Sequence, residues 1–117
     1  PGGVRAGGGA MTHVDIITTQ HSFKTTLKFT KLSEDAISMH IDTECKHLLN
    51  AIQGQPFALD PMIELFRSAD SVLTRLADQL PHRACPFLFS ALKGLEIEAG
   101  LERPVQVQIN ARRQGGE

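Results

Sequence analysis

Two cysteines and a histidine are the residues of this chain whose types and spacing suit shared chemistry. Cys45 lies at the predicted start of one helix, and Cys85, before Pro86, is expected at the N-cap of another. Free backbone N–H groups and the helix dipole stabilise a thiolate at such positions. His82 precedes Cys85 by three residues and is close enough to share its site. Thiolate and imidazole ligands suit zinc or another transition metal.

The elements predicted around these residues bring a second histidine, His21, to the same place. Stretches that alternate apolar and polar residues predict strands over 13–19, 23–31 and 36–42. The separators are short and turn-like, so the three strands are expected to form an antiparallel meander. In a meander, the first turn and the end of the third strand lie at the same end of the sheet. We therefore expect His21, in the first turn, to lie near Cys45.

The remaining segments predict the rest of the fold. Apolar residues at helical spacing predict four helices, over 44–53, 60–67, 70–80 and 86–99. Val105, Val107 and Ile109 predict a closing strand over 104–109. The predicted fold class is α+β: an antiparallel sheet, made of the meander plus the C-terminal strand, covered on one face by three to four helices in two layers. The last helix is expected to pack centrally, through Leu92 and Leu95.

Composition and charge narrow the classes of function. The chain has 117 residues, a net charge of −1, six Phe, and no Trp or Tyr, so nucleic acid is not an expected partner. No apolar run approaches the roughly 20 residues of a membrane span, so no membrane association is expected. Two cysteines are too few for a secreted disulfide framework, which predicts a cytoplasmic protein. Residues 1–11 are interpreted as a leader-like or tag-like segment, 12–110 as a single domain, and 111–117 as a polar tail.

Other polar groups are interpreted as structural. His40, Lys24 and Lys28 are expected on the open face of the sheet, where polar side chains are normally solvated. Glu96 and Glu98 are two residues apart on a helix, so their carboxylates are not expected to face each other.

Residues 80–109 carry the most specific pattern in the chain. A His-x-x-Cys-Pro step at His82, Cys85 and Pro86 precedes a helix of the form A-x-L-K-A-x-E-x-E-A-G-L-x-x-P, in which Gly94 stands for the central Ala. This stretch resembles a family of small, uncharacterised bacterial and archaeal proteins without a known activity. The looser part of the resemblance extends to Cys45, and it implies a site formed by Cys45, His82 and Cys85.

The chain departs from this family at the first turn. Family members carry Cys-Gly-Phe there, whereas this chain has His21-Ser22-Phe23. The departure has two interpretations: His21 replaces a thiolate ligand, or the site has lapsed in this chain.

Three functions remain open on these grounds. The first is a small cytosolic binding or accessory protein, rather than an enzyme, with Cys45, Cys85, His82 and His21 as metal ligands. The second is a thiol–disulfide redox enzyme or sensor that cycles Cys45 and Cys85. The third is a structural protein–protein interaction module, in which both cysteines are simply buried small hydrophobes. The sequence does not identify a small-molecule ligand. The first strand carries few charges, so we expect an open sheet edge and a symmetric homodimer.

Overall fold

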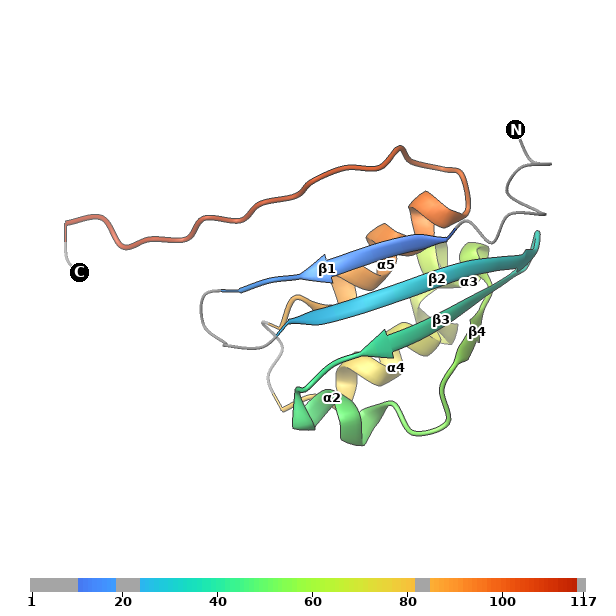
Figure 1. Cartoon of the computed structure of the whole chain (residues 1–117), viewed down its shortest axis with the longest axis horizontal. Helices are drawn as coiled ribbons and strands as arrows, with labels where there is room; N and C mark the ends of the chain where they lie inside the picture. The colour runs from blue at the N-terminus through green and yellow to red at the C-terminus, as the bar shows by residue number, and fades with distance from the viewer. Residues whose placement is uncertain (1–10, 19–23, 82–84, 116–117) are drawn as a thin grey trace.

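The computed structural model describes residues 11–18, 24–81 and 85–115 (Figure 1). These residues form a four-stranded antiparallel sheet with the strand order β1-β2-β3-β4, over Thr12–Ile16, Thr25–Ser33, Ala36–Asp42 and Phe57–Leu59. The α-helices are α2 (Lys46–Ala51), α3 (Pro61–Phe66), α4 (Val72–Asp78) and α5 (Phe87–Glu98), with a 3-10 turn at Ser68–Asp70. The predicted α+β class, the meander and the four helices are confirmed.

The fourth strand is not the predicted one, because the segment over 104–109 pairs with no strand in the described part of the chain. Its place in the sheet is taken by β4, which pairs with β3 through Ile37↔Leu59 and Met39↔Phe57. With three residues, β4 is too short to show a period-two pattern. The chain leaves α5 near the start of β1 and then runs into the segment over 104–109. This segment could therefore join β1 only as a parallel neighbour, which is the less stable pairing per residue.

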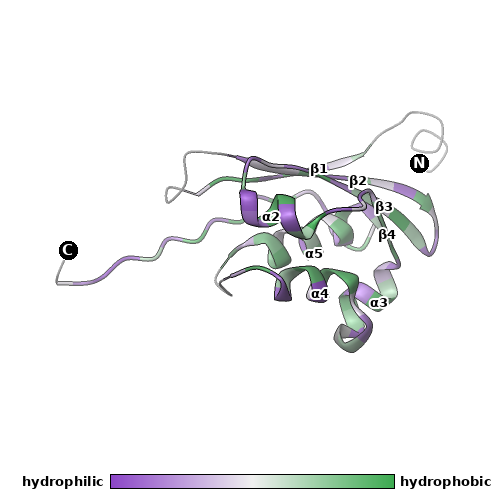
Figure 2. Ribbon diagram, turned by 90° about the horizontal axis from the view of Figure 1, so that it is seen from below, coloured by the Kyte–Doolittle hydropathy of each residue, from purple (hydrophilic) through white to green (hydrophobic). Residues whose placement is uncertain are grey.

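One face of the sheet is apolar and packs against the helices. Figure 2 shows α3, α4 and α5 on the same side of β1, β2 and β3. The core side chains are fully or almost fully buried, and include Leu27, Phe29, Ile37, Met39, Leu73, Ala91 and Leu95. Leu92, expected in the core, is only partly buried, because the stripe of α5 that faces inward is Phe87, Ala91, Leu95 and Glu98.

Gly94 allows α5 to approach the sheet closely. A Cβ atom at this position would lie 2.7 Å from Cγ2 of Val14 and would overlap the ring of Phe29. Any larger residue would therefore force α5 away from β1 and β2. This contact explains why glycine occupies the middle of α5.

The register of the sheet determines which connections lie together. Ile16 pairs with Thr25, and Thr26 pairs with Asp42, so the end of β1, the start of β2 and the end of β3 share one end of the sheet, here called the Asp42 end. Helix α5 begins at this end (Figure 1). Its last residue, Glu98, accepts hydrogen bonds at the opposite end, from Thr12 Oγ1 at 2.7 Å and from the backbone N–H of Lys31 at 2.8 Å.

Candidate functional site

Both cysteines belong to connections at the Asp42 end. Cys45 is the N-cap of α2, three residues after β3 ends. Cys85 lies one residue before the N-cap of α5, which is Pro86 and not Cys85 as expected. Both are free, partly buried thiols that pack against the hydrophobic core. This packing is also what small hydrophobic side chains would show, so it does not distinguish a site from a structural role.

The predicted histidine ligands are not part of the described structure. His21 and His82 both lie outside the described ranges. Within residues 11–18, 24–81 and 85–115, no three His, Cys, Asp or Glu side chains are grouped closely enough to hold a metal ion. The structure therefore places the two sulfur donors at one end of the sheet and leaves the complete ligand set a prediction.

Two threonines fix the connection that carries Cys45. The hydroxyl groups of Thr25 and Thr43 lie 2.7 Å apart, which ties the start of β2 to the segment after β3. Thr43 Oγ1 also accepts the backbone N–H of Cys45 at 3.0 Å. The Cys45 side chain makes no capping bond to α2. The backbone of Cys45 is thus held in place, while its thiol has no capping role.

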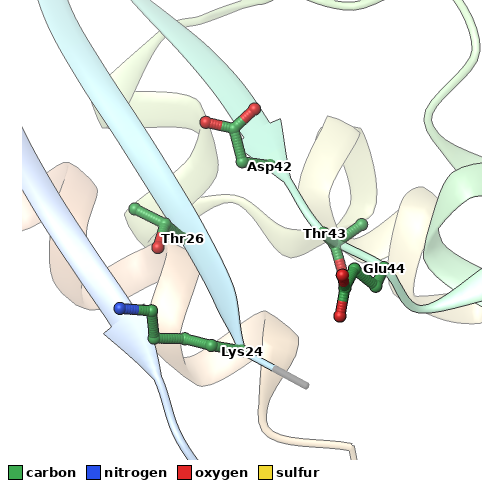
Figure 3. A pocket seen from close by; sticks show the side chains of 5 residues that line it. All are labelled: Lys24, Thr26, Asp42, Thr43 and Glu44. Atoms are coloured by element: carbon green, nitrogen blue, oxygen red, sulfur yellow. The ribbon is translucent and has the colours of Figure 1, made fainter.

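An open depression of about 450 Å³ lies at the same end, on the polar face of the sheet. Its lining residues come from the start of β2 and the end of β3: Lys24, Thr26, Asp42, Thr43 and Glu44 (Figure 3). Figure 3 shows the ammonium group of Lys24 turned away from Glu44. The lining offers hydroxyl, carboxylate and ammonium groups, which favour a polar ligand over an apolar one.

The charges beside this depression are ordered by the sheet. Lys28 Nζ lies 2.7 Å from Asp42 Oδ2, and His40 Nδ1 lies 3.6 Å from Asp42 Oδ1. The hydrogen bond from the Lys28 side chain lowers the pKa of Asp42, and the charge of Lys28 adds to this shift. On the other side of β2, Thr26 Oγ1 donates to Asp15 Oδ1 at 2.8 Å. Cross-strand register thus produces two polar rows, His13–Lys28–His40 and Asp15–Thr26–Asp42.

Two buried carboxylates lie away from this end and are structural. Glu64 accepts hydrogen bonds from Ser71 Oγ at 2.7 Å and from the N–H groups of Val72 and Leu73 at 2.9 Å, so it caps the start of α4. This role was not predicted, because Glu64 lies in α3 and the groups that it caps lie at the start of α4. Glu98 joins α5 to β1 and β2, whereas Glu96 pairs with Lys93 at 2.9 Å. The carboxylates of Glu96 and Glu98 therefore do not share a site, as expected.

Comparison with known proteins gives a family but no activity. The model of one family of unknown function, DUF6951, matches residues 12–111. No curated protein and no solved structure matches the chain. No helix in the described ranges combines the length and apolar character that a bilayer crossing requires. The match spans the sheet, all four helices and both cysteines, in agreement with the expected resemblance to an uncharacterised family. The chain belongs to DUF6951, a family of unknown function.

Proposed function

We propose that this chain is a small cytoplasmic binding protein that holds a transition metal, most simply zinc, at the Asp42 end of the sheet. The proposed ligands are Cys45, Cys85, His82 and His21. The observation that carries the proposal is the position of two free thiols in connections at one end of the sheet. Two thiolates and two imidazoles complete the tetrahedral set that structural zinc sites use.

The surroundings of the thiols support a site that is coupled to folding. Both cysteines contact the hydrophobic core, and the bond between Thr25 and Thr43 holds the segment before Cys45. A metal bound there would link the segment after β3 to the segment before α5. Because a metal that binds only the folded chain stabilises it, metal removal should lower the melting temperature.

The test is the metal content of protein purified without a chelator and then supplied with zinc. We expect about one zinc ion per chain, with its loss in both Cys45→Ser and Cys85→Ser, because each variant leaves an incomplete ligand set. His40→Ala is the matched control: it removes an imidazole from the polar face and should leave the zinc content unchanged. A wild-type chain that takes up no zinc, or full zinc content in both serine variants, would overturn the proposal.

The free state of both thiols favours a second candidate function, a thiol–disulfide sensor. Cys45 and Cys85 would then lose two electrons and two protons to a peroxide or disulfide oxidant and form one S–S bond. A thiol count before and after mild oxidation measures this. Loss of both thiols, reversed by dithiothreitol and abolished in either serine variant, supports the sensor. Two unchanged thiols reject it.

We also propose that the protein is a symmetric homodimer. Among the described residues, β1 pairs only with β2, so its outer backbone groups face away from the sheet. Open edges of this kind are normally covered, charged or paired. Light scattering should therefore give twice the mass of the 12.8 kDa chain at micromolar concentration.

A further inference from the structure

The segment after α5 has the sequence of a strand but lies apart from the sheet. Residues 103–113, here called the C-terminal arm, are exposed throughout and extend away from the body of the molecule (Figure 1). Val105, Val107 and Ile109 are 53%, 49% and 79% exposed and alternate with Gln106 and Gln108. Three large apolar side chains on one side of an exposed, extended segment are typical of an interaction surface.

Strand β1, whose first residue lies near the end of α5, has an apolar face that is only partly buried. The inward-facing side chains Val14 and Ile16 are only partly buried. On the opposite edge, the inward-facing Leu59 of β4 is 1% exposed, and Phe57 on the same face is partly buried. A further strand beside β1 would cover the parts of Val14 and Ile16 that remain exposed.

We propose that the C-terminal arm of each copy pairs with β1 of a second copy as a fifth, antiparallel strand. This inference deepens the proposed homodimer and is independent of the proposed metal site. Reciprocal pairing of the arms would cover the β1 edge of both copies and bury both arms in one closed, two-fold symmetric assembly. The alternation of the arm would place Val105, Val107 and Ile109 beside Val14 and Ile16, with the glutamines on the polar face.

The geometry of the chain favours a second copy over the arm's own β1. The arm leaves α5 at the end of the sheet where β1 starts, so within one chain the two segments could only be parallel. An arm from a two-fold related copy can run antiparallel. Eleven extended residues reach about 35 Å, about twice the length of the five-residue β1. The arm can therefore cross between copies and still pair along the whole of β1.

The arm also belongs to the family unit. The family match continues to residue 111, beyond Ile109 and past all the secondary structure of the body. Pro104, which lacks an N–H group, stands at the first position of the proposed strand, where proline is tolerated. Both the free edge and its proposed occupant are thus present in the same matched region.

The experiment compares full-length Val107→Asp with the matched control Gln106→Asp by light scattering at several concentrations. A charge at residue 107 would enter the apolar face of the proposed strand, whereas a charge at residue 106 would stay on the polar face. We expect a dimer for the wild type and Gln106→Asp, and a twofold lower mass for Val107→Asp. The helical signal in circular dichroism should be unchanged, because the arm contributes no helix to the folded body.

Hydrogen exchange identifies the partner of the arm. Amides of β1 and of the arm should be protected in the wild-type dimer, and both should lose protection in Val107→Asp. A wild-type monomer would overturn both the homodimer and the proposed pairing of the arm with β1 of a second copy. If Val107→Asp stays dimeric, or if β1 amides exchange hydrogen at the same rate in both proteins, the arm does not pair with β1. The homodimer itself would then still stand.

Discussion

The β3 side and the β1 side of the sheet differ in the neighbours that the chain provides for these strands. At the β3 edge, β4 pairs with residues Ile37 to Met39, and the side chain of Gln55 continues the ladder. Its Oε1 accepts the N–H of Ile41 at 2.8 Å, and its Nε2 donates to the C=O of Ile41 at 3.2 Å. At the β1 edge, the described residues provide no such neighbour. The chain therefore covers β3 with a short strand and a side chain, whereas β1, which like β4 is an edge strand, has only β2 beside it among the described residues.

Leu59→Ala should have the largest effect, because it leaves a cavity in the core beneath β4. Leu59 is 1% exposed and fills the core beneath β4. Its truncation should lower the free energy of unfolding by about 2–5 kcal/mol in urea denaturation. Val14→Ala is the matched truncation at the β1 edge, where the side chain is only partly buried, and should cost clearly less. Equal losses in the two variants would show that the edges do not differ in this way.

Gly94→Ala should act where α5 packs on β1 and β2. The new methyl group would overlap the Phe29 ring and crowd Val14, so α5 must move away from β1. We expect a net loss of about 1–3 kcal/mol from overpacking, even though alanine is about 1 kcal/mol more favourable than glycine within a helix. Ser90→Ala, on the same helix, is the control and should stay within about 0.5 kcal/mol of the wild type. A more stable Gly94→Ala would contradict the close approach of α5.

Substitution of Gln55 should cause a smaller loss of stability on the β3 side of the sheet. Gln55→Ala would leave the N–H and C=O of Ile41 without their partner, at a cost of about 1 kcal/mol because water can reach this part-buried position. Gln55→Glu keeps the acceptor for the N–H but has no donor for the C=O. Urea denaturation should place Gln55→Glu between the wild type and Gln55→Ala; a Gln55→Ala variant as stable as the wild type would show that the side chain does not extend the ladder.

Period-two alternation made most of this sheet predictable, but it did not identify partners. Leu27 and Phe29 in β2 alternate with polar residues, and so do Ile37, Met39 and Ile41 in β3, because one face is buried and the other is solvated. The same alternation at 104–109 predicted a strand that the structure does not contain, because no strand in the described part of the chain lies where it could pair antiparallel as the chain leaves α5. The three residues of β4 are too few to show any period.

For the helices and the site as well, local sequence patterns predicted the elements but not the contacts between them. Helical spacing predicted α5, but it did not predict that Ala91, Gly94 and Leu95 face the sheet while Leu92 is only partly buried. The shared end of Cys45 and the first turn followed from the meander alone. The buried cap formed by Glu64 could not be predicted, because its partners lie in another helix. The metal ligand set of the proposed site stays a prediction, since His21 and His82 lie outside the described residues.

The smallest expected effect concerns the polar contacts on the two sides of β2. Lys28 and Asp42 form an ion pair between β2 and β3, whereas Thr26 and Asp15 form a hydrogen bond between β2 and β1. The hydrogen bond from Lys28 lowers the pKa of Asp42, so this pair stabilises the fold above the unfolded-state pKa near 3.9. That contribution is lost as pH falls through the lower folded-state value. Because both side chains are well exposed, it should stay below about 1 kcal/mol and decrease with added salt.

Asp42→Asn tests this contribution against Asp15→Asn. Urea denaturation of Asp42→Asn should show a flatter loss of stability than the wild type at pH values below about 4, and a weaker response to salt. Asp15→Asn keeps a hydrogen-bond acceptor for Thr26 and leaves the ion pair between β2 and β3 intact, so it should retain the salt dependence of the wild type. If both variants lose the same salt dependence, the electrostatic contribution belongs to the polar face as a whole. The ion pair would then not distinguish the β3 side of the sheet from the β1 side.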